Sequence, residues 1–252
     1  MRFTKMQGLG NDYLYFCGKA PDNAPELSRR LSDRHFGPGA DGLIFMGPSN
    51  RADFSMRIFN ADGSEARMCG NGIRCVGKYV YDRGLTNKTE LTIDTGAGLR
   101  RVFLYPENGR VSKVAVEMGK ARVEPRAEGG CYVDVGNPHL VVFVPDAEAA
   151  PLRTEGARLS RSVPGGVNVE FVSLTAPGRL RMRVWERGSG VTLACGTGAC
   201  AAAAAAVKLG LCRAEQPVEV LLDGGALRVW VAEDGRLRME GPAVTVYEGE
   251  IE

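Results

Sequence analysis

The sequence CGNG at residues 69–72 returns as CGTG at residues 195–198, and this repeat decides how the rest of the chain is interpreted. The two copies are 126 residues apart, which is half of the 252-residue chain. The same shift, applied without a gap, places the Gly-Asn pair at residues 10–11 on the Gly-Asn pair at residues 136–137. Self-similarity at one fixed offset indicates two homologous halves.

The match extends to a polar position near the repeated motif, because Asn60 falls on Glu186 under the same shift. We therefore expect an N-terminal domain over residues 1–118 and a C-terminal domain over residues 119–252. The segment 241–252 is expected to pack back on the first domain. The alternative is a single domain in which the match is a coincidence.

Strand patterns dominate both halves. Short runs of Val, Ile, Phe, Tyr and Leu are bounded by Gly, Pro, Asn or Asp, which is typical of antiparallel strands. They lie at residues 91–94, 102–105, 114–117, 140–144, 167–174, 180–185, 218–222, 227–231 and 237–240.

Only three segments have a helical pattern: Pro25–His35 and the segments that follow Cys69 and Cys195. Gly84 and Gly210 stand where the last two helices would end. The third segment contains an unbroken run of alanines, so neighbouring backbones can approach it closely. We expect this helix to run through the middle of its sheet, and the fold class to be α+β.

The composition is that of an ordinary globular protein, with 44% hydrophobic and 25% charged residues. The net charge of +2 is spread along the chain, so we expect no nucleic-acid binding. The N-terminus lacks an apolar stretch with a cleavage site, and no window approaches the roughly 18 apolar residues of a membrane span. We therefore expect no membrane contact and a cytoplasmic location. Seven cysteines are an odd number in a chain without an export signal, which favours reduced thiols.

Cys69 and Cys195 each stand in a Gly-rich turn at the start of an expected helix. Unpaired N–H groups and the helix dipole stabilise a thiolate there and can also hold an anion. A carboxylate bound by the amides of Gly70–Gly72 and Gly196–Gly198 would place the neighbouring carbon between two sulfurs. Inversion of an α-carbon needs two acid–base groups on opposite faces, one protonated and one deprotonated. The pattern therefore predicts a two-base epimerase.

No lysine lies in a context that suggests a Schiff base, and no Walker-type phosphate loop is present, so we expect no cofactor. We expect no metal either, because the cysteine spacings do not match those of structural zinc and only two histidines are available. Cys75 and Cys200 are interpreted as core residues, and Cys17, Cys131 and Cys212 as structural.

Four sequence blocks together make the chain resemble the diaminopimelate epimerase family from end to end. They are KMQGLGND at residues 5–12, RIFNADGS at 57–64 continuing to MCGNG at 68–72, GNPH at 136–139, and ERG at 186–188 continuing to ACGTGAC at 194–200. The resemblance implies interconversion of LL- and meso-diaminopimelate in lysine and cell-wall precursor synthesis, without pyridoxal phosphate. It also implies two homologous β-rich domains, each a mixed sheet or barrel wrapped around a central helix, with the site in the cleft between them.

The same resemblance implies roles for individual residues. Cys69 and Cys195 would be the acid–base pair, with His139 and Glu186 beside them at the reacting end. The implied substrate-binding residues are Asn11, Asn60, Gly70, Asn71, Asn137, Asn168, Glu186, Arg187, Gly196 and Thr197. A substrate with two amino and two carboxyl groups does need a cation, a carboxylate and neutral amides. Without the resemblance, Glu186 and Arg187 could be a surface pair at a strand end, and His139 a plain turn residue.

The chain departs from the family pattern at Gly42, where some members carry Gln, and we expect backbone or water to replace that side-chain contact. Members also vary between Ser and Thr at Thr197, which leaves the backbone amide unchanged. The resemblance further implies a homodimer formed through strands of the N-terminal domain, with Tyr247 as a candidate interface residue.

Three other functions compete with this interpretation. A proline racemase or hydroxyproline epimerase would also use paired cysteines, but Asn60, Asn168 and Arg187 supply more polar groups than a proline ring could satisfy. An isomerase of the phenazine-biosynthesis type lacks the paired cysteines. A thiol-based redox protein would cycle a Cys69–Cys195 disulfide during turnover, whereas an epimerase would be inactivated by that bond.

Overall fold

The computed structural model describes residues 1–126 and 130–251. Residues 127–129, near the start of the predicted second domain, and residue 252 at its end lie outside this description. Within the described ranges, no helix combines the length and the apolar character needed to cross a lipid bilayer.

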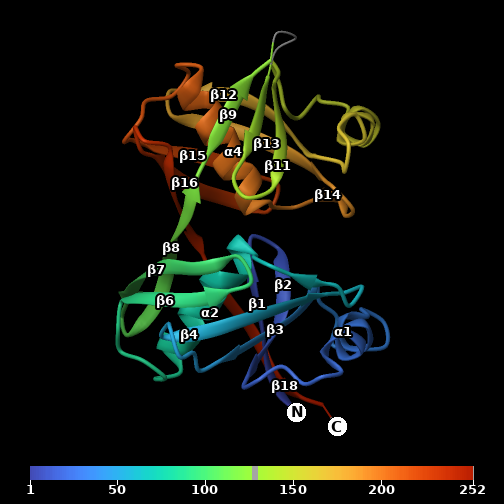
Figure 1. Cartoon of the computed structure of the whole chain (residues 1–252), viewed down its shortest axis with the longest axis vertical. Helices are drawn as coiled ribbons and strands as arrows, with labels where there is room; N and C mark the ends of the chain where they lie inside the picture. Colours follow the sequence, from blue (N-terminus) through green and yellow to red (C-terminus); the bar gives the residue numbers. More distant parts are fainter. Residues whose placement is uncertain (127–129, 252) are drawn as a thin grey trace. The chain divides into compact units, whose positions relative to one another are not determined.

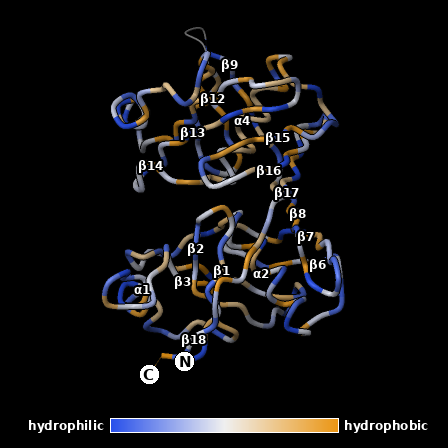
Figure 2. The backbone as a smooth tube through the Cα atoms, turned by 180° about the vertical axis from the view of Figure 1, so that it is seen from behind, coloured by the Kyte–Doolittle hydropathy of each residue, from blue (hydrophilic) through white to orange (hydrophobic). Residues whose placement is uncertain are grey.

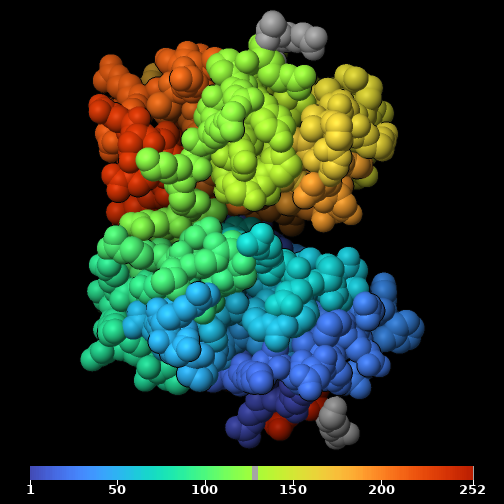
Figure 3. Space-filling view, viewed as in Figure 1, coloured from blue at the N-terminus to red at the C-terminus, as the bar shows by residue number. Residues whose placement is uncertain are grey.

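The chain divides into two compact units. Met1–Val116 and Gly241–Glu252 form the first unit, and Glu117–Glu240 forms the second. The chain leaves the first unit within strand β8 (Arg110–Lys120) and returns to it within strand β17 (Arg236–Pro242). The two ends of the chain therefore belong to the same unit, and Figure 3 shows them side by side, dark blue beside red.

The first unit contains one mixed sheet with strand order β18–β1–β2–β3–β4–β6–β7–β8, and β5 is added to β4. Two of its strand pairs, β2–β3 and β4–β6, are parallel. The elements are β1 (Arg2–Gly8), β2 (Asn11–Cys17), α1 (Ala24–Ser32), β3 (Gly42–Gly47), β4 (Phe54–Asn60), β5 (Glu65–Ala66), α2 (Gly70–Asp82), β6 (Glu90–Thr95), β7 (Gly98–Glu107), β8 and β18 (Val244–Glu250).

The second unit contains a sheet with strand order β9–β10–β11–β12–β13–β15–β16–β17, and β14 is added to β13. Its parallel pairs are β11–β12 and β13–β15. The elements are β9 (Arg122–Pro125), β10 (Cys131–Asp134), β11 (Pro138–Phe143), η1 (Leu152–Gly156), α3 (Ala157–Ser160), β12 (Asn168–Ala176), β13 (Arg179–Glu186), β14 (Gly190–Thr192), α4 (Gly196–Lys208), β15 (Pro217–Leu222), β16 (Gly225–Val231) and β17.

The two sheets have the same topology. Strands β1 to β4 and β6 to β8 correspond in order and direction to β10 to β13 and β15 to β17, and the small strands β5 and β14 also correspond. The prediction of two homologous β-rich halves is therefore confirmed.

A central helix lies against the strands of each unit, as Figure 1 shows. Helix α2 packs on β1, β2 and β7, and α4 packs on β10, β11, β12, β13, β15 and β16. The alanines at residues 201–206 are all buried, because their small side chains let the strands come close to the helix backbone. Both helices end before a glycine with positive φ, 68° at Gly84 and 73° at Gly210, as the sequence predicted.

Several strands follow the expected two-residue alternation. In β6 and β15 every second side chain is buried, and Figure 2 shows hydrophobic and hydrophilic residues alternating along many of the strands. In β2, β3 and β12, by contrast, consecutive side chains are buried. Alternation gives a strand one buried and one exposed face.

The prediction for the first helix was wrong in detail. The first helix ends at Ser32 instead of His35, because the Asp33 carboxylate accepts hydrogen bonds from the amides of His35 (2.7 Å) and Phe36 (2.8 Å) and so forms a turn.

A further helical stretch was missed altogether. The π-helix η1 and the short helix α3 together cover residues 152–160. The sequence of these residues has no helical pattern of apolar positions. They are held by tertiary packing, since Leu152 is buried in the cluster that includes Trp185, and Gly156 lies so close to the Trp185 side chain that an added Cβ would stand 2.9 Å away.

Candidate active site

Cys69 is the residue that caps the N-terminus of α2. Its backbone is extended (φ −139°, ψ 115°), and its sulfur accepts a hydrogen bond from the Gly72 amide at 3.2 Å. This is the position at which a helix leaves unpaired N–H groups, and here a sulfur takes the place usually held by a Ser, Thr or Asp oxygen. The helix start therefore presents a sulfur and free amides in one place.

Asn11 and Asn71 lie beside the Cys69 sulfur. The Asn11 Oδ1 atom is 3.4 Å from Cys69 Sγ and 3.4 Å from Asn71 Nδ2. Asn11 is held from behind, because its Nδ2 donates to Asp41 Oδ2 at 2.7 Å. The Tyr13 hydroxyl, which the sequence analysis did not single out, is also hydrogen-bonded to the Cys69 sulfur.

Opposing influences act on the Cys69 thiol. Burial raises its pKa, which favours the thiol. The hydrogen bonds from the amides of Gly72 and Asn71 and from the Tyr13 hydroxyl favour the thiolate, as does the positive charge of Arg74, a fully buried guanidinium on the first turns of α2. Both protonation states thus have partners in this half of the site.

Cys195 caps α4 in the same manner. Its backbone is extended (φ −127°, ψ 110°), and its sulfur accepts from the Gly198 amide at 3.4 Å and lies 3.5 Å from the Thr197 hydroxyl. The equivalence of Cys69 and Cys195, expected from the offset, is thus present in the local geometry of the two helix starts.

His139, on β11, is completely buried between two oxygens. Its Nδ1 lies 2.6 Å from Glu170 Oε1, and its Nε2 lies 3.1 Å from Asn137 Oδ1. The Asn137 amide nitrogen donates to Thr197 Oγ1 at 3.4 Å, so both ring nitrogens of His139 face acceptors in this amide orientation. Asn137 therefore connects His139 to Thr197 at the start of α4.

Glu186 ends strand β13 beside Cys195. Its Oε1 accepts from the Thr192 hydroxyl at 2.5 Å, and it is also hydrogen-bonded to Cys195. Burial raises the pKa of Glu186, opposed by these two hydrogen bonds. Burial likewise raises the pKa of Cys195 well above its usual range, and the negative charges of Glu186 and Glu170 raise it further. This half of the site favours the thiol.

Asn168 is the first residue of β12, and Arg187 directly follows β13. They lie next to each other because these two strands pair in antiparallel direction. Asn168 Oδ1 accepts from the Arg187 amide at 2.9 Å. The Arg187 guanidinium is exposed and donates to the Gly165 carbonyl at 2.8 Å. Arg187 is therefore held by neutral carbonyl groups in this structure, with its charge available to an anion.

Asn60 lies in the first unit, and among the described residues no hydrogen bond joins it to the other predicted site residues of that unit. Its Nδ2 donates to Ser64 Oγ at 3.0 Å, and among the described residues no hydrogen bond connects it to Cys69. It pairs in the sheet with Gly42, where an added Cβ would stand only 2.1 Å from the Phe59 carbonyl oxygen. Glycine at position 42 therefore lets β3 and β4 approach closely.

Three residues of these clusters were not predicted from the sequence: Tyr13, Glu170 and Arg74. The 126-residue offset could have found Tyr13, because it is the equivalent of His139. Glu170 alternates with Asn168 along β12, so a carboxylate on the inward face of an apolar strand was a usable signal. No comparable signal exists for Arg74, since an arginine in a helix is normally exposed.

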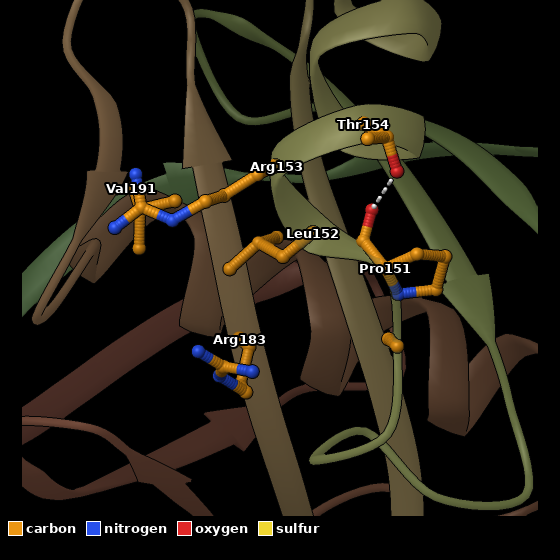
Figure 4. A pocket seen from close by; sticks show the side chains of 7 residues that line it. Pro151, Leu152, Arg153, Thr154, Arg183 and Val191 are labelled. Carbon is orange, nitrogen blue, oxygen red and sulfur yellow. Dashed lines mark hydrogen bonds between the residues drawn. The ribbon is translucent and has the colours of Figure 1, made fainter.

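A pocket of about 390 Å³ lies elsewhere on the second unit. Figure 4 shows it between η1 and strands β13 and β14, with the Thr154 hydroxyl bonded to the Pro151 carbonyl at 3.2 Å. Leu152, Arg183 and Val191 line it, but none of the predicted site residues does. The predicted site residues therefore lie outside this pocket.

Comparisons with known proteins agree with one another. The sequence model of the family described as "Diaminopimelate epimerase" matches residues 3–124 and 131–246. A protein of Bacteroides thetaiotaomicron named "Diaminopimelate epimerase" is 48% identical over 264 residues, covering 100% of this chain and 98% of that protein.

Solved structures that resemble the chain share its fold at low identity. A phenazine biosynthesis protein of the PhzF family from Bacillus anthracis has a TM-score of 0.81 at 18% identity, covering 100% of this chain and 99% of the other. A probable proline racemase from Agrobacterium radiobacter K84 has a TM-score of 0.76 at 20% identity, covering 100% and 92%. At such identities the likeness shows the fold alone.

Proposed function

The chain belongs to the diaminopimelate epimerase family, and we propose that Cys69 and Cys195 are the two acid–base groups with which it inverts the substrate carbon. The activity is the interconversion of LL- and meso-2,6-diaminopimelate, an isomerisation in lysine biosynthesis. The substrate is a small molecule.

The observation that carries the proposal is the shared geometry of the two cysteines. Each sulfur caps a central helix and accepts from the third helical amide, at 3.2 Å for Cys69 and 3.4 Å for Cys195. Two equivalent thiols on two homologous units are what inversion demands, since a proton leaves one face and another arrives on the opposite face. The proposal thus assigns one sulfur to each face of the α-carbon.

The amides at the helix starts are suited to the α-carboxylate of the reacting end. Those of Gly70 and Asn71 on α2, and of Gly196 and Thr197 on α4, lie at the positive dipole ends of the two helices. As the α-proton leaves, negative charge spreads into the carboxylate, and pre-oriented donors stabilise that charge without reorganising.

The remaining polar groups are assigned to orientation and recognition. We assign the Glu186 carboxylate and the Asn137 amide to the ammonium group at the reacting end, where His139 stands beside them. Asn11, Asn60 and Asn168 offer neutral amide contacts, and the exposed Arg187 guanidinium suits the distant carboxylate. A ring substrate such as proline has no second carboxylate for Arg187.

The chemistry balances with the two thiols alone. A thiolate takes the α-proton and becomes a thiol, and the electron pair of the C–H bond remains on the α-carbon. The opposite thiol then gives its proton to the other face and becomes a thiolate. The enzyme ends with the two protonation states exchanged, so one proton must pass between the cysteines, through solvent, before the next identical turnover.

The test is proton exchange followed by NMR. Reduced enzyme is mixed with LL-diaminopimelate in D2O, and the α-signal and the appearance of the meso isomer are recorded. Deuterium should enter the α-position as meso product forms, and Cys69→Ala and Cys195→Ala should each abolish isomerisation. Cys17→Ala, which removes an exposed thiol of the first unit, is the matched control and should remain active.

Two outcomes would contradict the assignment. Full isomerisation by either Cys→Ala variant would remove that cysteine from the acid–base pair. Exchange with proline but not with diaminopimelate would point to a proline racemase activity instead.

We propose in addition that the protein is a cytoplasmic homodimer. Support for the dimer is the exposed apolar surface of β18, where Val244 (42%), Val246 (53%) and Tyr247 (41%) retain much of their accessible surface. Support for the location is the biosynthetic substrate and the seven free thiols. Analytical ultracentrifugation of the wild type and Val246→Lys tests the dimer: the variant should sediment as a monomer.

A further inference from the structure

Glu170 is a buried carboxylate directly beneath the start of α4. Its side chain is completely buried, and Oε1 lies 2.6 Å from His139 Nδ1. A Cβ atom added to Gly198 would stand 2.7 Å from the same oxygen, so the glycine allows the carboxylate to reach the helix start. Among the described residues, no group donates to the second oxygen, Oε2.

The homologous half carries an apolar residue at the same place. The 126-residue offset pairs Glu170 with Ile44, and Gly198 with Gly72. A Cβ added to Gly72 would stand 2.7 Å from Ile44 Cδ1, so Ile44 and Glu170 occupy matching positions under matching glycines. The duplication therefore shows that the fold needs no carboxylate here.

The charges around the two sulfurs differ accordingly. Cys195 is faced by Glu186 from β13, by Glu170 from β12, and by the Thr197 hydroxyl and Gly198 amide of its own helix, with His139 on β11 next to both carboxylates. A thiolate there would add a negative charge beside the buried Glu170, which is bonded to His139, and the half-buried Glu186. Such a cluster of like charges in a dry site is costly.

Cys69 is faced by a different set of groups. The Tyr13 hydroxyl on β2, the amides of Asn71 and Gly72, and the buried Arg74 charge favour a thiolate. Asn11 Oδ1 accepts from the thiol and opposes them. The equivalent of Arg74 in the second half is the uncharged Cys200.

We propose that Glu170 is a positioning residue of the reaction, which orients His139 and keeps Cys195 a thiol, so that Cys69 loses its proton first and begins turnover as the base. This inference rests on the proposed role of the two cysteines. Glu170 thus affects the protonation state of Cys195 through its neighbours, without contact to the substrate.

The test measures each thiol separately in the free enzyme. Reduced protein is alkylated with iodoacetamide at a series of pH values, and modification at Cys69 and Cys195 is quantified by peptide mass spectrometry. Because only the thiolate reacts, the pH midpoint of each rate profile reports deprotonation, while accessibility scales the rate equally at every pH. No substrate is needed, so the result is independent of whether the chain isomerises diaminopimelate.

Three variants separate the charge of Glu170 from its contact with His139. Glu170→Gln removes the charge but keeps an oxygen acceptor for Nδ1, and Glu170→Asp keeps the charge but shortens the reach. The control Glu148→Gln removes a surface carboxylate that pairs with Arg181 and Arg183.

In the wild type the Cys69 midpoint should lie at lower pH than the Cys195 midpoint. Glu170→Gln should move the Cys195 midpoint to lower pH, with a rate gain at pH 8 of about tenfold for each pH unit moved. The Cys195 profile of Glu170→Asp and Glu148→Gln should stay near that of the wild type. Both Glu170 variants should lower kcat for epimerisation more than they raise KM.

The proposal is overturned by either of two results. One is a wild-type Cys195 midpoint at or below that of Cys69, which requires no variant and so stands even if Glu170→Gln does not fold. The other is a folded Glu170→Gln whose Cys195 profile equals that of Glu148→Gln. Loss of epimerase activity in that Glu170→Gln protein would not rescue the proposal, because a purely structural residue behaves in the same way.

Discussion

Gly198 lies over Glu170 so closely that a Cβ on the glycine would stand 2.7 Å from the carboxylate oxygen. The same glycine would bring that Cβ to 3.2 Å from Cys195 Cβ. Glu170 has no freedom to withdraw, because it is buried and bonded to His139. The backbone atom, the carboxylate and the sulfur are therefore packed against one another with no room for a methyl group.

Gly198→Ala should displace Glu170 and lower both stability and activity. We expect a loss of about 1–3 kcal/mol in the free energy of unfolding from overpacking. The misplaced His139–Cys195 cluster should lower kcat by roughly 10- to 100-fold. Urea unfolding and the isomerisation assay measure the two effects.

Gly72→Ala is the matched control, because it makes the same change at the equivalent position of α2. Its Cβ would meet the flexible end of Ile44 at 2.7 Å and the end of Met56 at 3.3 Å, both of which can turn aside. Alanine also gains roughly 0.5–1 kcal/mol over glycine within a helix. Equal losses of kcat in Gly72→Ala and Gly198→Ala would show that Glu170 has no special part in the effect.

Gly42 yields a second prediction, since it pairs with Asn60 across β3 and β4. Gly42→Gln, which installs the residue some family members carry, should lower the free energy of unfolding by about 1–3 kcal/mol, because its Cβ would collide with the Phe59 carbonyl. It should not improve KM for diaminopimelate. Gly47→Ala, in the same strand but 3.5 Å from its nearest neighbour, should be nearly neutral in a urea titration.

Much of the fold was readable because its signals are local or repeated. The CGNG and CGTG motifs predict both helix starts, and the glycines at residues 84 and 210 predict where those helices end. Turn residues between apolar runs predict the strands. The 126-residue offset predicts that one topology occurs twice, without any knowledge of which strands pair.

Other features depend on contacts that a single sequence does not display. Residues 152–160 become helical by packing near Trp185, and their own pattern does not favour a helix. Glu170 stands in an apolar strand, and its direction is known only once β12 has been placed against the helix. Arg74 resembles an ordinary surface arginine until the helix around it proves to be buried.

Cys75 provides a prediction about alkaline stability. Burial raises the pKa of the Cys75 thiol from 9.0 to about 11. The folded state therefore holds this proton more tightly than the unfolded state. The stabilisation is complete below pH 9 and is lost as the pH rises toward 11, and a shift of two units corresponds to about 3 kcal/mol at most.

Cys75→Ala should therefore have a flatter pH dependence than the wild type. The difference in unfolding free energy between the two should shrink between pH 9 and pH 11, as measured by urea titration at each pH. Val76→Ala, a truncation at the next buried position, should instead lower stability by the same amount at every pH. If the difference in unfolding free energy between the wild type and Cys75→Ala also stayed constant with pH, the buried thiol would not cause the loss of stability at alkaline pH.

Oxidation tests the proposal that one substrate carbon fits between the two sulfurs. Sulfurs that bracket a carbon can meet when the substrate is absent, so air oxidation should form a Cys69–Cys195 disulfide and abolish activity. Reduction should restore activity, and bound substrate should slow the inactivation. Peptide mapping under non-reducing conditions identifies the pair, with Cys17→Ala as a control that should oxidise in the same way. If both thiols stayed free, or paired with other cysteines, the two cysteines would not share a substrate in the manner proposed. Reversible loss of activity through this one bond would also distinguish an epimerase from a redox protein, because a redox protein needs the bond to turn over.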